Sequence, residues 1–293
     1  MSGSQIGRVS NEAEAVRRAY DRDPEAEWQR LEGGTQRRLE YLITCHALKR
    51  HLPPVSLVSP MSSSPPHLLD AGGGPGRYTI HLAEQGHTVT LLDLSPALLA
   101  LARRRIAEAG RVVQQHVADV IEGSITELSD FPDDHFDAVL CLGGPLSHVL
   151  DPAQRVIALA ELRRVAKPGA PLFISVMNRL GAYRTVVQWA DSWSQVFPHL
   201  LTSGHSTLAS EAPAYFFLPE EFSTLLETVG LTVERLYGSA GIGAHLHEER
   251  LAAVLDHPER WPLWREALLE TCDHPNVVGV SPHLLAVARR PAG

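Results

Sequence analysis

The stretch His67-Leu-Leu-Asp-Ala-Gly-Gly-Gly-Pro-Gly76, followed by Thr88-Val-Thr-Leu-Leu-Asp93, decides the fold of this chain. Its order predicts a strand, a glycine loop, a helix and a second strand that ends in a carboxylate, which together make half of a nucleotide-type binding crevice. The glycines are spaced as Gly72-x-Gly74-x-Gly76. This spacing excludes the dinucleotide fingerprint GxGxxG, because the third glycine would be missing from either starting point.

Asp70 and the glycine loop after it resemble the first motif of the class I S-adenosylmethionine-dependent methyltransferases, which is an acidic residue followed by GxGxG. The resemblance implies S-adenosyl-L-methionine as the cofactor, with the loop backbone near its methionine moiety and Asp93 accepting both ribose hydroxyls. Glycine lacks the Cβ that would block such an approach, and a carboxylate accepts both protons of a diol. The alternative is a tight turn beside a solvated strand end, and the register of strand, loop, helix, strand and acid disfavours it.

The same resemblance implies contacts with the adenine. Leu94 would pack on the ring, and Ser124 stands where the family usually has an acid that binds the adenine amino group. The full set of implied cofactor contacts is Asp70, Gly72, Gly74, Gly76, Asp93, Leu94, Ser124, Leu142 and Gly143.

Buried strands alternate with amphipathic helices after residue 67. This alternation, with Phe136-Asp137 before an apolar run and Lys167-Pro-Gly before another, predicts a Rossmann-like α/β fold. We expect a seven-stranded, mostly parallel sheet with helices on both faces and an antiparallel last strand. Strands are predicted over 67–70, 88–92, 117–122, the run after Phe136-Asp137, 171–177, 231–237 and 283–289, and core helices over 77–85, 96–115, 152–167 and 219–230.

Four regions follow from this pattern. Residues 1–66 are predicted to form an N-terminal helical cover, broken at Pro24, and a proline- and serine-rich connector. Residues 67–178 are expected to form the cofactor-binding core and 219–293 the rest of the core sheet. Residues 179–218 are predicted to form a helical lid inserted over the active site, and the alternative for this segment is a structural flap or a dimer contact. In the cover, Tyr20 is either a substrate contact or a packing aromatic that anchors a helix.

Composition limits the classes of partner. The chain has 293 residues, 20% of them charged, and a formal net charge of −8, which argues against a nucleic-acid or anionic-membrane surface. No apolar run is long enough to span a membrane, and the first residues do not resemble a secretory signal, so we expect a cytoplasmic protein. The expected partner is a small molecule, and the protein is expected to be a monomer or a homodimer.

Histidine supplies the candidate base. His148 lies in the loop after the fourth strand, where open α/β sheets bind ligands, and its ordinary pKa lies near neutrality. The alternative is a loop or capping histidine. Arg179 and Tyr183 are candidates for a substrate carboxylate or carbonyl, and His205 is a candidate in the lid. The pair His245-x-His247 has metal-like spacing, but no acid or cysteine pattern accompanies it, so no metal is predicted.

The predicted function is methyl transfer to an oxygen, nitrogen or carbon of a small molecule. The N/D-P-P-Y/F tetrapeptide of many amino-methylating relatives is missing, which disfavours methylation of nucleic-acid bases. Two alternatives stay open at this point: an enzyme of the same fold that uses the cofactor for cyclisation or rearrangement, and a non-catalytic cofactor-binding partner protein.

Overall fold

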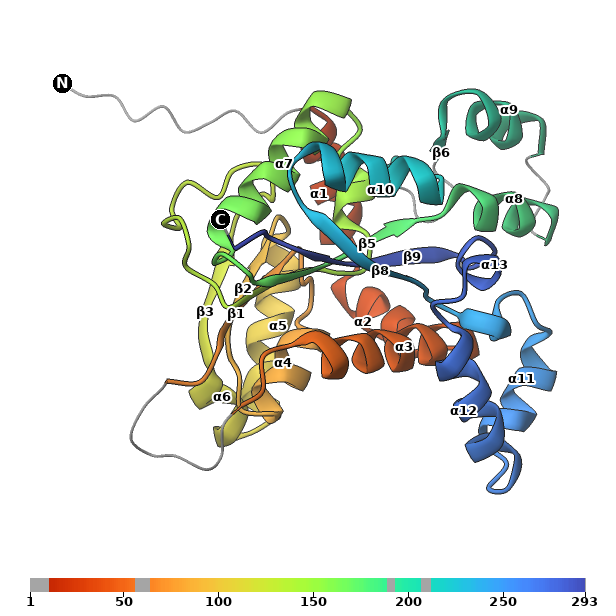
Figure 1. Ribbon diagram of the computed structural model, residues 1–293, viewed down its shortest axis with the longest axis horizontal. Helices are drawn as coiled ribbons and strands as arrows, with labels where there is room; N and C mark the ends of the chain where they lie inside the picture. Colours follow the sequence, from red (N-terminus) through yellow and green to blue (C-terminus); the bar gives the residue numbers. More distant parts are fainter. Residues whose placement is uncertain (1–10, 56–63, 189–192, 207–211, 293) are drawn as a thin grey trace.

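The computed structural model describes residues 11–55, 64–188, 193–206 and 212–292. Its centre is a seven-stranded sheet with helices on both faces (Figure 1), in the order β3-β2-β1-β4-β5-β9-β8. The strands are β1 His67–Ala71, β2 Thr88–Asp93, β3 Val117–Glu122, β4 Ala138–Cys141, β5 Pro171–Met177, β8 Thr232–Gly238 and β9 His283–Arg289. The five strands from β3 to β5 are parallel, and β9 is antiparallel to both β5 and β8. The predicted fold class is confirmed.

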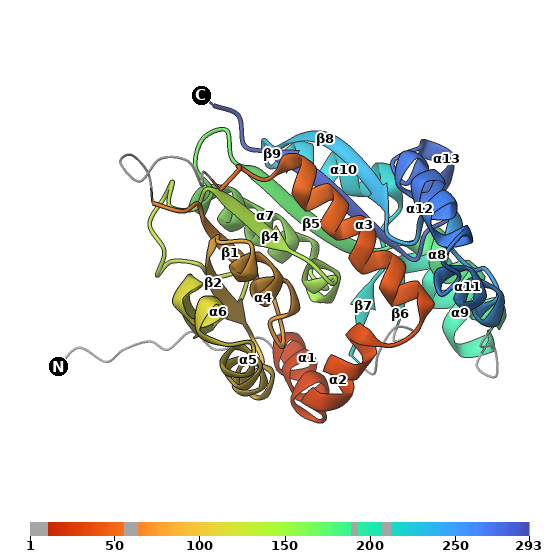
Figure 2. The ribbon, with the colours of Figure 1, turned by 90° about the horizontal axis from the view of Figure 1, so that it is seen from below.

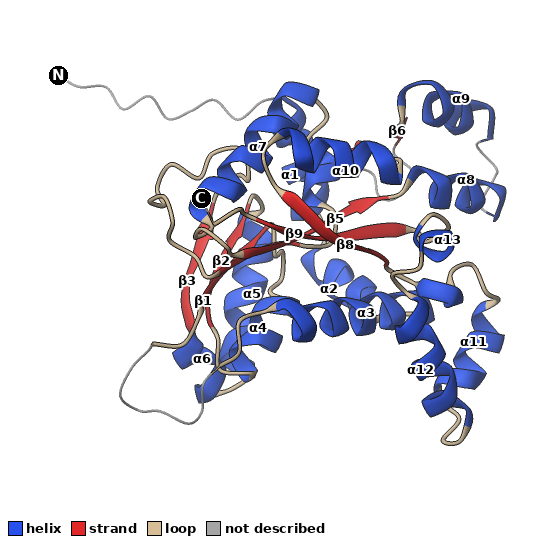
Figure 3. Ribbon diagram, viewed as in Figure 1, coloured by secondary structure: helices blue, strands red, loops and turns tan. Residues whose placement is uncertain are grey.

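Helices form a layer on each side of the sheet (Figure 3), and alternate strand residues pack against opposite layers. In β1, Leu69 joins the apolar cluster of one face and Leu68 joins that of the other, and both are fully buried. The first face is covered by α7 Pro152–Val165 and α10 Pro219–Thr228. The opposite face is covered by α3 Thr35–His51, which Figure 2 shows lying across the sheet, together with α4 Arg77–Glu84, α5 Pro96–Glu108, α6 Arg111–His116 and α12 Arg260–Thr271.

The remaining elements lie outside these two layers. Two helices precede α3, and Figure 2 shows them beside α5 at one edge of the molecule. Two others and a two-stranded ribbon follow β5. These elements and the short helices are α1 Asn11–Asp21, α2 Pro24–Glu32, η1 Pro145–His148, α8 Arg179–Gln188, α9 Trp193–Ser203, β6 His205–Ser206, β7 Ala214–Tyr215, η2 Gly241–Gly243, α11 Glu248–Leu255 and α13 Pro275–Val278.

Two predicted boundaries can be compared directly. The cover is broken before Pro24, as expected, because Asp23 caps α2 and proline occupies its first helical position. The predicted helix 96–115 is wrong as a single element, because Gly110 adopts a left-handed φ of 95° between α5 and α6. Residues 1–10 and the 56–63 part of the connector lie outside the described residues.

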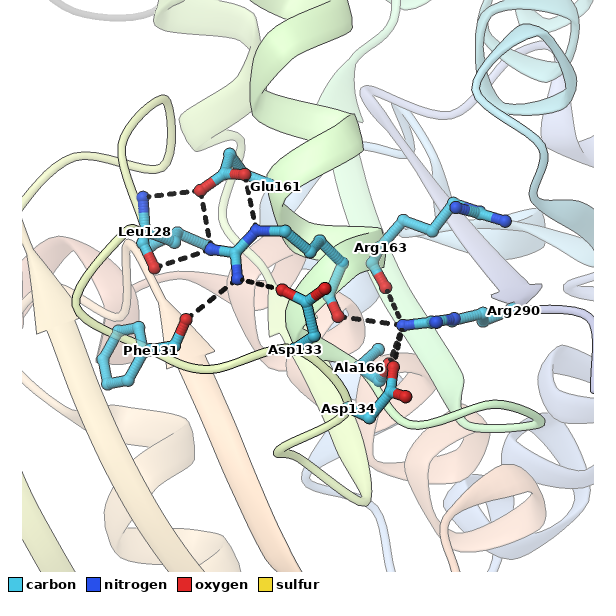
Figure 4. A network of polar contacts seen from close by, with 9 residues as sticks. Leu128, Phe131, Asp133, Asp134, Glu161, Arg163, Ala166 and Arg290 are labelled. Carbon is cyan, nitrogen blue, oxygen red and sulfur yellow. Dashed lines mark hydrogen bonds and ion pairs between the residues drawn. The ribbon is translucent and has the colours of Figure 1, made fainter.

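A polar network fastens the end of the chain to α7 (Figure 4). Arg290 donates to the carbonyls of Arg163, Arg164 and Ala166, at 2.6–3.1 Å, and pairs with Asp134. Arg164 in turn forms a bidentate ion pair with Glu161, at 2.8 and 2.9 Å. The carbonyls at the end of a helix have no partner within it, so these guanidinium contacts cap α7 and stabilise the core behind the site. None of the helices in the described ranges is both long and apolar enough to cross a bilayer.

Candidate active site

A cavity of about 560 Å³ opens at the carboxyl ends of β1, β2 and β4. Its floor is the glycine loop, its walls are the loops after β2, β3 and β4, and its roof is α1 and α2. This volume falls within the range of about 300–1,000 Å³ that is usual for small-molecule sites. The position is the one at which open parallel sheets bind ligands.

The glycine loop leaves no room for side chains on its inner side. Gly72 and Gly73 donate backbone hydrogen bonds to the Leu92 carbonyl at 2.7 and 3.2 Å, which fixes the loop to β2. A Cβ on Gly72 would lie 2.4 Å from the Pro145 ring, and Gly74 has a left-handed φ of 56°. The loop therefore presents backbone directly to the cavity, as a nucleotide-type ligand requires.

Asp93 ends β2 at the cavity wall. Its Oδ2 accepts from the Gly74 amide and its Oδ1 from the Ser95 amide, both at 2.8 Å. Burial raises the pKa of Asp93 to about 6. Each carboxylate oxygen has a further lone pair, so the group is positioned and able to accept two hydroxyl protons from a ligand.

Asp70 and Gly76 lie away from the cavity, although the sequence grouped them with the cofactor contacts. Asp70 is fully buried beneath the loop and accepts from the Thr79 hydroxyl at 2.7 Å, and burial raises its pKa to about 6. Gly76 begins α4, and a Cβ there would lie 3.4 Å from Ala102. Both residues shape the loop from behind and do not line the cavity.

The far end of the cavity is formed mainly by the loops after β2 and β3. Leu94, Leu98, Ser124 and Ile125 all line it. The Ser124 hydroxyl lies 2.7 Å from that of Thr126 and also accepts from the Thr126 amide. Leu142 and Gly143, at the end of β4, line the cavity as well, so these predicted contacts surround one space.

The roof is fastened to the core by polar contacts. Asp21, at the end of α1, accepts from the Ser95 hydroxyl at 2.5 Å, and Glu25 in α2 pairs with Arg104 and Arg105 of α5. Arg105 also lies over the Trp28 ring, 4.9 Å from its centroid. These contacts hold α1 and α2 against α5.

His148 connects the loop after β4 with α1 through its contact with Tyr20. It lies at the end of η1, is 8% exposed and lines the cavity beside Tyr20. Its Nε2 lies 2.9 Å from the Tyr20 hydroxyl and its Nδ1 lies 2.9 Å from the Pro213 carbonyl. A carbonyl only accepts, so Nδ1 carries the proton and Nε2 accepts from Tyr20. Burial lowers the pKa of His148, which keeps the ring neutral.

The segment 179–218 was predicted to lie over the site. None of its described residues lines the cavity, although the Pro213 carbonyl holds His148 from outside it, and residues 189–192 and 207–211 lie outside the described residues. Its aromatic residues pack on one another, with the Trp193 and Phe197 rings stacked at 4.9 Å and Tyr183 5.7 Å from Phe197. Tyr183 and Phe197 pack against a separate small apolar cluster at the end of β5. Trp189, predicted as part of the lid, lies outside the described residues.

Arg179 and His205, predicted as substrate contacts, have structural partners instead. Arg179 donates to the Phe216 carbonyl at 2.9 Å and pairs with Glu221. The His205 ring packs edge-on against Tyr215 at 5.1 Å. Together with Tyr183, these side chains lie outside the cavity, so of the four predicted substrate contacts only Tyr20 faces it.

Two polar residues of α2 line the cavity although they were not among the predicted site residues. Glu27 and Arg30 both line the cavity and form a bidentate ion pair at 2.7 and 2.5 Å. Their i, i+3 spacing was a visible signal of a pair on one helix face. The spacing does not say which face points inward, because that depends on how α2 docks on α5.

The histidines after β8 form no metal site in the structure. His245 Nε2 lies 3.1 Å from the Val280 carbonyl, and His247 is exposed before α11. Over residues 11–55, 64–188, 193–206 and 212–292, no three His, Cys, Asp or Glu side chains are grouped as metal ligands would be.

Replacing Gly73 by alanine is expected to lower the free energy of unfolding by about 1–3 kcal/mol, because overpacking a filled interior has that typical cost. The new Cβ would lie 2.4 Å from the Leu91 side chain and 2.5 Å from Asp70 Oδ2. Urea unfolding followed by circular dichroism measures the loss. Gly279→Ala is the control, since its Cβ would meet no atom closer than 3.9 Å. Equal stability of the two variants would contradict the close packing under the loop.

Comparison with known proteins agrees with this geometry. Residues 68–169 match the family model described as a methyltransferase domain. A ubiquinone biosynthesis O-methyltransferase from Xylella fastidiosa is 34% identical over 172 residues, which are 58% of this chain and 63% of that protein. The chain thus matches less than two thirds of the length of this relative. In the match over residues 68–169 and in its fold, the chain is similar to the class I S-adenosylmethionine-dependent methyltransferases.

Solved structures show the same fold at low identity. A possible histamine N-methyltransferase from Thermotoga maritima has a TM-score of 0.56 at 16% identity. The superposition covers 94% of this chain and 99% of the Thermotoga chain. A [4+2]-cyclase has a TM-score of 0.53 at 18% identity, and the superposition covers 87% of this chain and 81% of the cyclase chain. Similarity at this level concerns the fold alone, so the reaction has to be argued from the site.

Proposed function

We propose that this protein is an O-methyltransferase that uses S-adenosylmethionine to methylate a phenolic or enolic hydroxyl of a small molecule. The observation that carries the proposal is the neutral His148 in the cavity wall, with its Nε2 hydrogen-bonded to a hydroxyl. The name of the Xylella relative, an O-methyltransferase, supports oxygen as the acceptor atom.

The residues of the cavity fit the cofactor. The glycine loop has no Cβ to obstruct the methionine part, and Asp93, already aligned by two amides, would accept the ribose hydroxyls. Leu94, Leu98 and Ser124 would enclose the adenine at the far end. When bound, S-adenosylmethionine supplies an electrophilic methyl group on a sulfonium.

The chain's own contribution is alignment, exclusion of water and removal of one proton. The roof formed by α1 and α2 holds an acceptor against the floor, and such alignment lowers a bimolecular barrier. A phenol has a pKa of about 10, and a histidine of pKa near 6.5 or below removes its proton only as the new bond forms. An unactivated alcohol is a far weaker acid, so the histidine favours phenols and enols as acceptors.

Methyl-labelled S-adenosylmethionine and a panel of phenols, with matched benzylic alcohols and anilines, test this proposal. We expect mass spectrometry to find the label on phenolic oxygen, together with an equivalent amount of S-adenosylhomocysteine, and none on the benzylic alcohols. An extract of small molecules serves as a second source of acceptors. Label found only on nitrogen or carbon would overturn the assignment to oxygen, and a rearranged product without label transfer would favour cyclisation.

A further inference from the structure

The last turn of α1 reaches both walls of the cavity. Asp21 accepts from the Ser95 hydroxyl at 2.5 Å and from the Ala97 amide at 3.3 Å, on the side of Asp93. Its neighbour Tyr20 reaches His148 on the opposite side, at 2.9 Å. The contacts of Asp21 fix the end of α1 on the core, and they thereby position the neighbouring Tyr20 against His148.

The ring of His148 has both of its nitrogens in hydrogen bonds. Nδ1 donates to the Pro213 carbonyl, and the lone pair of Nε2 already accepts from Tyr20. The two rings also meet edge to face, with centroids 5.5 Å apart and an interplanar angle of 85°. A phenolic hydroxyl accepts as well as donates, so an acceptor in the cavity meets the hydroxyl oxygen of Tyr20 before it meets the histidine nitrogen.

We propose that Tyr20 is a further catalytic residue, which takes the proton of the acceptor hydroxyl and passes its own proton to His148. This inference rests on the proposed function. In the step, the acceptor O–H proton moves to the Tyr20 oxygen while the Tyr20 proton moves to Nε2 of His148. The acceptor oxygen forms its bond to the methyl carbon, and the carbon–sulfur bond breaks with its electron pair left on sulfur. Tyr20 ends neutral and His148 ends as an imidazolium.

The surroundings of His148 suit a proton that arrives only during the reaction. Burial lowers its pKa, and the Pro213 carbonyl, the Glu27 carboxylate, Arg30 and His283 are the groups that act on it from neighbouring elements. The carbonyl and the carboxylate favour the imidazolium, whereas the guanidinium and the second histidine oppose it. The product imidazolium would keep a partner on each nitrogen, since Nδ1 stays on Pro213 and Nε2 then donates to Tyr20.

Tyr20→Phe tests the relay, because it removes one oxygen and keeps the ring against His148. With a phenolic acceptor, kcat is expected to fall by about 10²–10³-fold, the lower part of the range for loss of a proton-transfer group. Binding of S-adenosylhomocysteine is expected to stay unchanged. Tyr237→Phe is the control, because Tyr237 forms a similar pair with the remote His51, at 3.1 Å. It removes the same oxygen outside the cavity, and its kcat should remain native.

A second readout does not depend on turnover. In the cofactor-free protein, ring-nitrogen NMR of labelled histidine, with His148→Ala to identify the signal, is expected to show a lower pKa for His148 in Tyr20→Phe than in the native protein. The reason is that the Tyr20 hydroxyl is hydrogen-bonded to both forms of the ring, and the bond it would accept from the charged imidazolium is the stronger one. In addition, the double variant Tyr20→Phe with His148→Ala is expected to be no slower than His148→Ala alone, as for two groups in one relay.

The outcomes separate this inference from the proposed function. A native kcat and a native His148 titration in Tyr20→Phe would overturn the relay and leave His148 as the direct base. Loss of kcat without any change in the titration would also overturn it, because the hydroxyl would then not engage the histidine. If the native protein transferred no methyl group to oxygen, the proposed function would fail, and the NMR result would still decide whether Tyr20 donates to His148.

Discussion

Asp93→Ala is expected to weaken binding of S-adenosylhomocysteine by at least about 100-fold, since each hydrogen bond to a charged group typically contributes about 1.5–3 kcal/mol and two are lost. The variant also frees the Gly74 and Ser95 amides that Asp93 now holds at 2.8 Å, which loosens the loop. Isothermal titration calorimetry measures the change. Asp93→Asn keeps one accepting oxygen and should give an intermediate loss.

The same experiment has a pH-dependent readout. Burial raises the pKa of Asp93 to about 6, so the carboxyl is largely protonated at pH 5 and ionised above pH 7. Ribose hydroxyls donate best to the ionised form, so the affinity of the native protein should rise as pH increases through about 6. This rise should be lost in Asp93→Asn. Asp130→Asn, an exposed acid on another loop, is the control. Unchanged affinity in Asp93→Ala would remove Asp93 from the cofactor site.

Most strands of the sheet, and the part of the site formed by segments close together in the chain, could be predicted from the sequence. Strands such as 171–177 and 283–289 were predicted at their observed bounds, because continuous apolar runs are what strands buried on both faces require. The glycine loop and Asp93 are joined by a single helix, so short-range order was enough to bring them together. The break at Gly110 was missed because apolar residues continue the helical pattern on both sides of it.

The other half of the site depends on contacts between distant segments. Tyr20 and His148 are 128 positions apart, and they meet because Asp21 and Glu25 fasten the cover to Ser95 and to the arginines of α5. No periodicity in the sequence predicts such docking. The lid prediction met the same limit: the aromatic residues Tyr183 and Phe197 of its described part pack into a small apolar cluster of their own, a use of apolar surface that the sequence pattern does not distinguish from the wall of a pocket.

His148→Ala is expected to lower kcat for a phenolic acceptor by about 10²–10⁴-fold, the usual cost of removing a positioned base. Cofactor affinity should change little, because His148 lies at the other side of the cavity from Asp93. For the native protein, kcat should be level above pH 7 and fall only in acid. The reason is that burial lowers the pKa of His148, so the ring stays neutral until the pH drops below its ordinary value of about 6.5.

The control for this variant is His116→Ala, which removes a half-buried imidazole at the end of α6, outside the cavity. It should keep native kcat and the native pH profile. If His148→Ala also kept both, the histidine would be a wall residue, and catalysis would rest on alignment and exclusion of water alone. A loss confined to acceptors with a protonated oxygen, with pre-ionised acceptors still methylated, would instead assign the rate loss to proton removal. We expect the rate loss to be confined to acceptors with a protonated oxygen, because a neutral imidazole, hydrogen-bonded to a hydroxyl, lines the cavity.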